Sequence, residues 1–216
     1  MRRSTKTLAA VGALGAFGAA VYWRRNPSAC PYRGGRFALD LPRPIITRSR
    51  LVRLLAPEPG ERLLEIGPGT GHYTVPVASR LGPDGRLDAL DLQRAMLQHT
   101  RDRARDAGVD AVAFSQGDAR RLPYRDGAFD GAYLVLVLGE VPDRRAALSE
   151  LRRVVRPGGR LVVGELLPDP HMVPFGWLRK HAETAGFEFE NRIGGWAGYF
   201  ARFRVPAESA GQESMG

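Results

Sequence analysis

The sequence predicts an α/β fold, in which a doubly wound, mostly parallel sheet carries helices on both faces and ends in an antiparallel hairpin. Short apolar runs alternate with helical patterns from residue 62 to residue 165. This alternation implies right-handed crossovers between parallel strands. The run 130–137 is apolar enough to be buried on both faces. Segments 187–193 and 199–205 alternate around a glycine-rich turn, which indicates the hairpin.

The elements follow in order from their apolar periodicity and their boundaries. A first amphipathic helix is expected over 47–55, because it ends before Pro57. Glycine and proline turns separate the elements after it. The expected strands are 62–66, 86–91, 111–115, 130–137 and 160–165. The expected helices are 74–81, 94–107, 145–155 and 177–185.

The formal charge of +9 is unevenly distributed over the 216 residues. Residues 1–56 hold eleven basic side chains against the single acid Asp40, whereas residues 57–216 hold 21 basic and 22 acidic ones. A near-neutral domain without a basic, aromatic-interleaved face argues against nucleic acid as a partner. The single cysteine, Cys30, and the four histidines show no metal-ligand spacing, so we expect no metal site.

The basic N-terminal region brackets an apolar segment, 8–23, that carries no charge. As a helix it would span about 24 Å, which is short against a hydrocarbon core of about 30 Å. Its C-terminal aromatic residues, Tyr22 and Trp23, suit a membrane interface. These features favour a retained anchor within residues 1–25 that meets the membrane through residues 7–23. A soluble or surface-lying helix and a cleaved signal peptide are the alternatives.

Three further units follow the anchor in the predicted organisation. Residues 26–46 contain four prolines and a Gly-Gly pair and are expected to form a linker. Residues 47–205 form the predicted domain, and the small, polar residues 206–216 form a disordered tail. Basic residues after the apolar segment favour a domain on the cytoplasmic side of the membrane. A cytoplasmic protein is the alternative, and no pattern indicates an oligomeric state.

A glycine-rich loop follows the first expected strand, at the sheet edge where parallel sheets bind ligands. Gly67, Gly69 and Gly71 permit unusual backbone angles and a close approach of the ligand to the main chain. The loop departs from the dinucleotide fingerprint, because His72 occupies the position of its third glycine. A phosphate-binding Lys-Ser/Thr pair is also absent from the loop. A nucleotide without a phosphate chain is therefore the better match.

Two aspartates stand at the ends of the next two expected strands. Asp91 lies twenty residues after Gly71, where a carboxylate can accept hydrogen bonds from both hydroxyls of a ribose. Asp118 follows Gly117 and is placed to accept a hydrogen bond from an exocyclic adenine amine, while the amide of Ala119 donates to a ring nitrogen. Each signal alone is weak, but their order and spacing together are specific.

The motifs together resemble class I S-adenosylmethionine-dependent methyltransferases, most of all the ubiquinone/menaquinone C-methyltransferase branch. They are the loop 65–71, Asp91, Gly117-Asp118, Phe129-Asp130 and Arg156-Pro157-Gly158-Gly159. The resemblance covers about residues 47–205. It implies a seven-stranded sheet with an antiparallel last strand, and S-adenosyl-L-methionine as cofactor.

The resemblance also implies a role for each matching residue. Glu65 would orient the loop near the methionine ammonium, Asp91 would bind the ribose, and Asp118 and Ala119 would bind the adenine. The full cofactor-binding set is Glu65, Gly67, Gly69, Gly71, Asp91, Leu92, Asp118 and Ala119. Residues 134–139 lack the small polar residue and the histidine that are frequent in this branch, so the acceptor side is not defined by analogy.

Methyl transfer from a sulfonium requires alignment of the reactants and exclusion of water rather than covalent help. No catalytic residue is assigned. Candidate bases near the sheet edge are His72, Tyr73, Glu140, Glu165 and His171. An apolar fourth-strand end and an aromatic C-terminal region favour a small hydrophobic or lipid-like acceptor, such as a quinone or a phospholipid. The sequence thus predicts a membrane-anchored methyltransferase; the alternatives are a soluble methyltransferase of a polar metabolite and a non-catalytic S-adenosylmethionine-binding protein.

Overall fold

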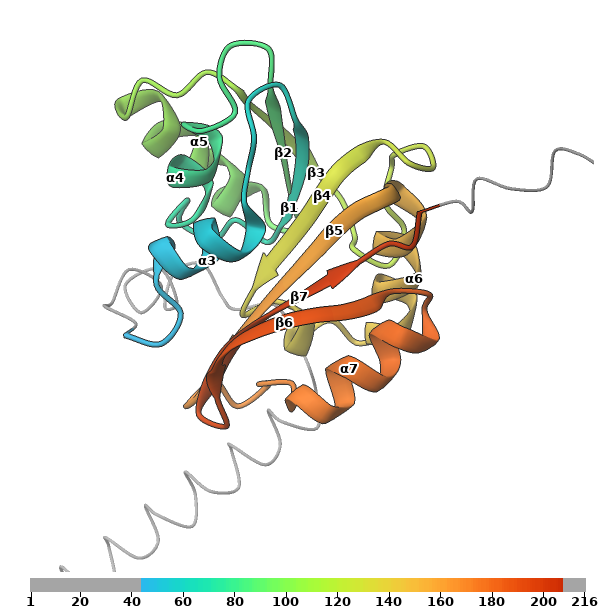
Figure 1. Cartoon of the computed structure of the whole chain (residues 1–216). Coiled ribbons are helices and arrows are strands. Elements are labelled where there is room, and N and C mark those ends of the chain that lie inside the picture. Colours follow the sequence, from blue (N-terminus) through green and yellow to red (C-terminus); the bar gives the residue numbers. More distant parts are fainter. Residues whose placement is uncertain (1–43, 208–216) are drawn as a thin grey trace, which may run out of the picture.

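The computed structural model describes residues 44–207 of the chain (Figure 1). The expected anchor (residues 1–25), most of the expected linker and the tail beyond residue 207 lie outside the described residues. Among residues 44–207, no helix combines the length and the apolar character needed to cross a bilayer. Ile46, the last residue of the expected linker, is fully buried, and its carbonyl accepts the hydroxyl of Tyr73 at 2.5 Å. The packed core therefore includes this residue.

The described strands form one seven-stranded sheet in the order β3-β2-β1-β4-β5-β7-β6. Their bounds are β1 (Arg62–Ile66), β2 (Arg86–Asp91), β3 (Val112–Gln116), β4 (Phe129–Val135), β5 (Val155–Leu166), β6 (Glu188–Gly195) and β7 (Gly198–Arg204). The first five strands pair in parallel, and β7 runs antiparallel to both β5 and β6. The predicted sheet and its terminal hairpin are confirmed.

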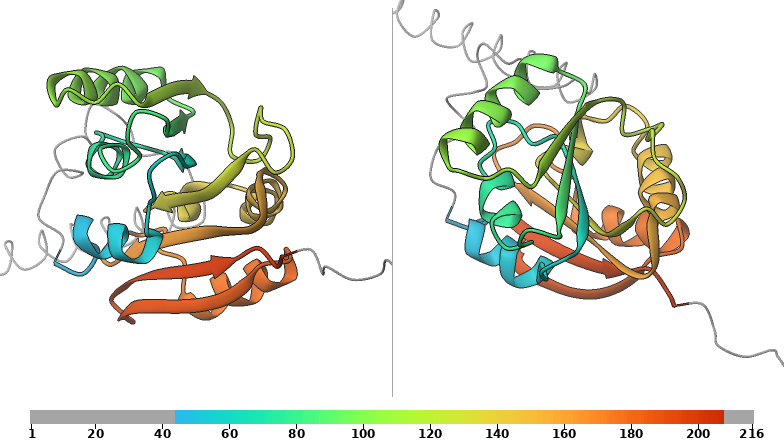
Figure 2. Two further views of the ribbon diagram at one scale, coloured as in Figure 1. Left: turned by 45° about the horizontal axis from the view of Figure 1, so that its top comes forward. Right: turned by 90° about the horizontal axis from the view of Figure 1, so that it is seen from above.

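Helices cover both faces of the sheet (Figure 2). One face carries α3 (Arg48–Leu55), α4 (Thr74–Ala78) and α5 (Arg94–Asp106), and the other carries α6 (Arg144–Val154) and α7 (Phe175–Thr184). A short 3₁₀ helix, η1 (Leu138–Glu140), follows β4. Two cores result: Leu51, Leu54 and Val77 pack under the first layer, and Leu148, Leu151 and Leu178 pack under the second.

Side chains at the helix starts explain where α3 and α6 begin. The hydroxyl of Thr47 accepts the amide of Arg50 at 3.3 Å before α3. The carboxylate of Asp143 accepts the amides of Arg145 and Ala146 at 3.1 and 3.0 Å before α6. These bonds satisfy amides that have no partner within the first helical turn.

Three elements differ from the expected bounds for identifiable reasons. Helix α4 ends at Ala78 instead of residue 81, because Arg80 and Leu81 donate to carbonyls three residues back and tighten the chain into a turn. Strand β5 begins at Val155, five residues early, because an irregularity in its pairing with β4 takes up the Pro-Gly-Gly stretch.

The third difference concerns β4, which ends at Val135 instead of residue 137. Leu136 has a left-handed backbone with φ of 60°, and its amide donates to the carbonyl of Gly164 at 2.8 Å. The chain therefore bends at Leu136 and continues into η1. A run of apolar residues gives no sign of such a bend, because the left-handed conformation is rare for leucine.

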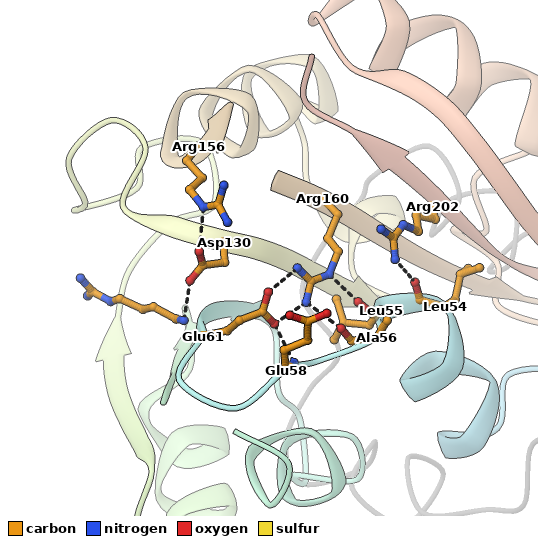
Figure 3. A network of polar contacts seen from close by, with 10 residues as sticks. Leu54, Leu55, Ala56, Glu58, Glu61, Asp130, Arg156, Arg160 and Arg202 are labelled. Atoms are coloured by element: carbon orange, nitrogen blue, oxygen red, sulfur yellow. Dashed lines mark hydrogen bonds and ion pairs between the residues drawn. The ribbon is translucent and has the colours of Figure 1, made fainter. Parts of the chain in front are cut away.

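An arginine on β5 ties α3 to the sheet (Figure 3). Arg160 is 8% exposed, and its guanidinium donates to Glu61 at 2.7 Å, to the carbonyl of Ala56 at 3.0 Å and to the carbonyl of Leu55. Arg202 on β7 donates to the carbonyl of Leu54 at 2.8 Å. These bonds satisfy the last carbonyls of α3, which have no partner within the helix.

Candidate functional site

A cavity of about 340 Å³ opens at the carboxyl ends of the parallel strands. It lies between the ends of β1 and β2, the start of the segment after β3, and the bend after β4. This is the point at which the order of the parallel strands reverses, because β1 lies between β2 and β4. Parallel α/β sheets bind ligands at such points. Six predicted site residues line it: Gly67, Gly69, Asp91, Leu92, Asp118 and Ala119.

The first glycines of the loop bring its backbone to the cavity wall. Gly67 and Gly69 have φ of 67° and 58°, a region that favours glycine. The amide of Gly67 donates to the carbonyl of Leu90 at 2.8 Å, which joins the loop to β2. A Cβ at Gly67 would clash with the side chain of Val137. The absence of a side chain therefore lets the bend after β4 close against the loop.

Gly71 has a different position from the other two glycines and does not line the cavity. A Cβ there would lie 3.1 Å from a methyl of Thr100 on α5. The hydroxyl of Thr100 donates to the carbonyl of Gly69 at 2.9 Å, and Arg103 donates to the carbonyl of Thr70 at 3.1 Å. Gly71 thus allows α5 to hold the loop in place from behind.

Asp91 supplies a carboxylate to the cavity at the end of β2. One of its oxygens, Oδ1, accepts the amide of Gln93 at 2.8 Å. Burial raises the pKa of Asp91 from 3.8 to about 6, against the lowering effect of the amides of Gln93 and Leu92. The side chain is therefore mostly ionised at neutral pH and can accept hydrogen bonds from a diol.

Glu65 lies beneath the loop and not in the cavity wall. It is 3% exposed, and its Oε2 accepts the hydroxyl of Thr74 at 2.6 Å, a bond that connects β1 to α4. Burial raises the pKa of Glu65 to about 7, against the lowering effect of the bond from Thr74. Glu65 thus fixes the two ends of the loop relative to each other. Its role near a ligand ammonium stays a prediction.

Asp118 lines the cavity together with Arg120, a residue that the motif did not indicate. The guanidinium of Arg120 donates to both carboxylate oxygens, at 2.6 Å to Oδ2 and 3.1 Å to Oδ1. The Arg120 side chain lowers the pKa of Asp118. Part of the carboxylate is therefore engaged within the protein, and the predicted bond to an adenine amine would use its remaining acceptor capacity.

The opposite wall is apolar and comes from the bend after β4. It consists of Val135, Leu136, Val137, Val141 and Pro142, with Glu140 as the ionisable side chain of this stretch. The sequence predicts one strand over 130–137, whose apolar end favours a hydrophobic acceptor. In the structure the strand ends at Val135, and Leu136 and Val137 form part of the wall after the bend. Helix α5 adds Met96. The wall consists of aliphatic residues like those of any core segment, so no pattern in the sequence distinguishes it.

Of the five candidate bases, only Glu140 lines the cavity. His72 bonds to Arg48 on α3 at 3.1 and 3.3 Å. Tyr73, Glu165 and His171 are buried. Within residues 44–207, no three His, Cys, Asp or Glu side chains are grouped so that they could hold a metal ion.

Comparisons with known proteins agree with this geometry. Residues 64–163 match a family described as a methyltransferase domain. A solved S-adenosylmethionine-dependent methyltransferase from Aquifex aeolicus superposes with a TM-score of 0.74 at 17% identity, covering 82% of this chain and all of the other. The [4+2]-cyclase SpnF superposes with a TM-score of 0.67 at 22% identity, over 74% of this chain and 80% of its own. Residues 64–163 therefore match a methyltransferase domain, and the described chain has the fold of class I S-adenosylmethionine-dependent methyltransferases.

Within that class, the sequence is similar to enzymes of the ubiquinone/menaquinone C-methyltransferase branch. The enzyme UbiE of Ectopseudomonas mendocina, a ubiquinone/menaquinone biosynthesis C-methyltransferase, is 41% identical over 64% of this chain and 53% of its own length. A demethylmenaquinone methyltransferase of Bacillus cytotoxicus is 32% identical over 59% of this chain and 54% of its own. The chain thus spans about half the length of these relatives. The predicted class and its cofactor, S-adenosyl-L-methionine, are confirmed.

Proposed function

We propose that this protein transfers a methyl group from S-adenosyl-L-methionine to a small lipophilic acceptor with a quinone-like ring. The observation that carries the proposal is the contrast between the two walls of the cavity. Asp91, Asp118 and Arg120 offer polar groups on one side, whereas residues 135–137 offer aliphatic side chains on the other. The similar proteins described above are named for menaquinone and ubiquinone biosynthesis, which supports an acceptor of this kind.

The cavity fits the cofactor in its residue chemistry. A nucleoside with a ribose diol matches the ionised Asp91, and the glycine loop gives the cofactor access to the main chain. Gly117 packs closely on Leu90 in the cavity lining, because a Cβ there would lie 2.9 Å from a methyl of Leu90. The bound cofactor would supply an electrophilic methyl group on a sulfonium. Asp91 and Leu92 on β2, with Asp118 and Ala119 after β3, would hold it.

The residues of the protein contribute alignment and exclusion of water. The bend at Leu136 places aliphatic groups against the loop at Gly67, so a ring seated there would be desolvated beside the reacting methyl. Glu140 is the ionisable side chain of this wall and would accept the proton that an acceptor carbon or hydroxyl releases. The carboxyl group of Glu140 would hold the proton until it exchanges with solvent.

Labelled cofactor tests the proposal directly. The protein is incubated with S-adenosylmethionine carrying a labelled methyl group and with either a lipid extract or a pool of soluble metabolites. Label in the lipid fraction, in a product with a quinone-like ring, is the expected result. Label only in the soluble pool would contradict the lipophilic acceptor and favour a polar metabolite. Calorimetric binding of the cofactor without any labelled product would favour a non-catalytic binding protein.

Membrane contact through residues 7–23 stays a prediction from the sequence. Fractionation of cells that express the full chain tests it, because an anchored protein sediments with the membranes. Recovery in the supernatant after the membranes are pelleted would favour the cytoplasmic alternative. A chain that begins at residue 44 serves as the control.

A further inference from the structure

Exposed apolar side chains gather at one edge of the sheet. Among the described residues, three large hydrophobic side chains are exposed: Leu92 at 51%, Leu167 at 40% and Trp196 at 85%. Leu92 follows β2, Leu167 follows β5, and Trp196 lies in the turn between β6 and β7. All three therefore lie at the carboxyl edge of the parallel strands, which is also the edge at which the cavity opens.

Trp196 lies in a turn that is joined to the end of β5 by backbone hydrogen bonds. Gly195 pairs with Gly198 across the hairpin, and Leu166 on β5 also pairs with Gly198. The amide of Leu167 donates to the carbonyl of Ala197 at 2.9 Å, which joins Leu167 to the same turn. Figure 1 shows the β6–β7 turn at the far end of the hairpin, beside the end of β5. Trp196 and Leu167 thus form one small surface, named the apolar edge below.

A second tryptophan shows that this exposure is not general. Trp177 on α7 stacks on His181 with ring centroids 3.9 Å apart, and the guanidinium of Arg144 lies 5.7 Å from its ring centroid. It also packs against the core beneath α7. Trp177 therefore has partners within the protein, and it serves below as the internal control for Trp196.

The described chain begins beside the apolar edge. A Cβ at Gly198 would lie 3.1 Å from Ile45, so the preceding segment reaches the domain next to this turn. That segment, residues 1–43, carries eight basic side chains and one acidic side chain, and it includes the uncharged run 8–23. A segment of this composition is attracted to an anionic bilayer. The described part of the chain therefore begins next to the turn that carries Trp196.

The size of the apolar edge distinguishes between kinds of partner. A stable protein interface buries about 800 Å² on each partner, far more than one indole and one leucine side chain offer. Tryptophan instead favours the headgroup level of a bilayer, where its ring meets apolar chains and its N–H meets water. The nearby acid Asp169 is turned toward the protein, since its Oδ1 accepts the amide of His171 at 2.7 Å. It is 19% exposed and presents little negative charge to a bilayer.

We propose that Trp196 and Leu167 contact the surface of an anionic lipid bilayer and turn the mouth of the cavity toward it. This rests on the proposed function for its purpose, since a lipophilic acceptor would then reach the cavity without crossing bulk water. The contact itself is a property of the folded protein and does not depend on turnover. Its test therefore uses fluorescence and not activity as the first measurement.

The experiment follows one tryptophan at a time in the full chain. Trp23→Phe with Trp177→Phe leaves Trp196, and Trp23→Phe with Trp196→Phe leaves Trp177. Each protein is mixed with vesicles of phosphatidylcholine and phosphatidylglycerol whose acyl chains carry bromine, a contact quencher. We expect the emission of Trp196 to shift to the blue and to fall by about half, as for an indole at the interface. The emission of Trp177 should remain unchanged.

Two results would overturn the proposal. One is sedimentation of the protein with the vesicles while the emission of Trp196 stays unchanged, since other residues would then make the contact. The other is equal quenching of Trp196 and Trp177, which would indicate unfolding on the membrane. Binding of S-adenosylmethionine by calorimetry verifies that each variant is folded.

A second variant separates this proposal from the proposed function. With Trp196→Ser we expect slower methylation of a quinol embedded in vesicles and unchanged methylation of a short-chain, water-soluble quinol. Equal rates for both substrates in the variant and the parent would contradict the membrane contact while leaving the methyltransferase function intact. No methylation of either substrate by the parent, together with quenching of Trp196, would contradict the function and support the contact.

Discussion

The two halves of the sheet differ in the surroundings of the acidic residue near the end of a parallel strand. One carboxyl group lines a cavity, and the other is enclosed in the core. Asp91 ends β2 in the cofactor half, lines the cavity and has a pKa of about 6. Glu165 lies one residue before the end of β5 and is 1% exposed. Its Oε2 accepts the amide of Val173 at 3.1 Å, whereas its Oε1 has no hydrogen-bond partner. Burial raises the pKa of Glu165 well above its usual value.

The difference originates in the chain that follows each strand. After β2 the chain turns directly toward α5 and leaves a cavity over the strand ends. After β5 the residues up to Val173 fold back over the sheet edge, where the hydroxyl of Tyr199 donates to the carbonyl of Val173 at 2.6 Å. A strand end in a parallel sheet thus becomes a binding site or a closed core according to the length and path of the next connection.

The largest expected effect is at the junction between the halves. Arg160→Ala leaves the carboxylate of Glu61 without its cationic partner and the carbonyls of Leu55 and Ala56 without the guanidinium donor. Removing one partner of a buried ion pair costs about 3–5 kcal/mol, so the free energy of unfolding should fall by that amount. Chemical denaturation measures it. Arg204→Ala, whose pair with Glu188 is half exposed, is the control and should change stability by less than about 0.5 kcal/mol. Similar losses in both variants would contradict the role of Arg160.

A substitution in the loop should affect the cofactor half alone. Gly67→Ala introduces a methyl group that clashes with Val137 at a backbone φ of 67°. We expect a loss of about 2–3 kcal/mol in stability and a loss of cofactor binding, from overpacking and strain together. Gly60→Ala is the matched control, because Gly60 has φ of 84° but no atom within 4 Å of its Cβ position. Gly60→Ala should lose about 1 kcal/mol of stability by strain and keep its affinity for the cofactor. Equal losses of stability in the two variants would show that backbone strain, and not the clash with Val137, is the cause.

Substitution of Asp91 tests the strand end that lines the cavity. Asp91→Ala should weaken S-adenosylmethionine binding about 10- to 100-fold, which is the equivalent of one or two charge-assisted hydrogen bonds. In the unsubstituted protein the affinity should also decrease as the pH falls below about 6, because protonation removes the acceptor carboxylate. Calorimetry across pH measures both. Asp110→Ala, an exposed residue outside the cavity lining, should bind as the parent does. An unchanged affinity in Asp91→Ala would remove Asp91 from the proposed site.

The smallest effect is expected at Glu165, at the buried end of β5. Folding raises the pKa of Glu165, so the folded state binds more protons than the unfolded state, and stability falls as the pH rises above about 4.5. Glu165→Gln should therefore cost less than about 1 kcal/mol at pH 5 and should reduce the loss of stability toward pH 8. Denaturation at both pH values checks this, with the exposed Glu183→Gln as control. An identical pH dependence in the parent and in Glu165→Gln would show that Glu165 does not remain protonated.

The sequence predicted the parts of the fold that depend on local periodicity. The alternating elements and the hairpin followed from apolar periodicity and glycine turns, and the cofactor followed from the family resemblance of the glycine and aspartate motifs. Six of the eight candidate residues line the cavity. Glu65 and Gly71 lie behind the wall instead, because a motif reports that residues are near a loop but not which way each faces.

The features that sequence reasoning missed depend on tertiary contacts. Leu136 and Val137 form the apolar wall only because the bond from Leu136 to Gly164 bends the chain after β4. Arg120 reaches the cavity through its bond to Asp118, and nothing in its sequence position distinguishes it from other surface arginines. The sequence places Trp196 in an aromatic C-terminal region that favours a hydrophobic acceptor, but a composition does not reveal whether a tryptophan faces inward or outward.

The left-handed conformation of Leu136 sets a limit on how stable this protein becomes without losing its site. A leucine in this region costs about 1–2 kcal/mol relative to an ordinary backbone conformation, and glycine would relieve most of that strain. Leu136→Gly would relieve this strain, but it would delete an aliphatic group that packs against the core and lines the cavity wall. Stability and acceptor recognition compete at a single backbone position, and variants improved for one should be screened for the other.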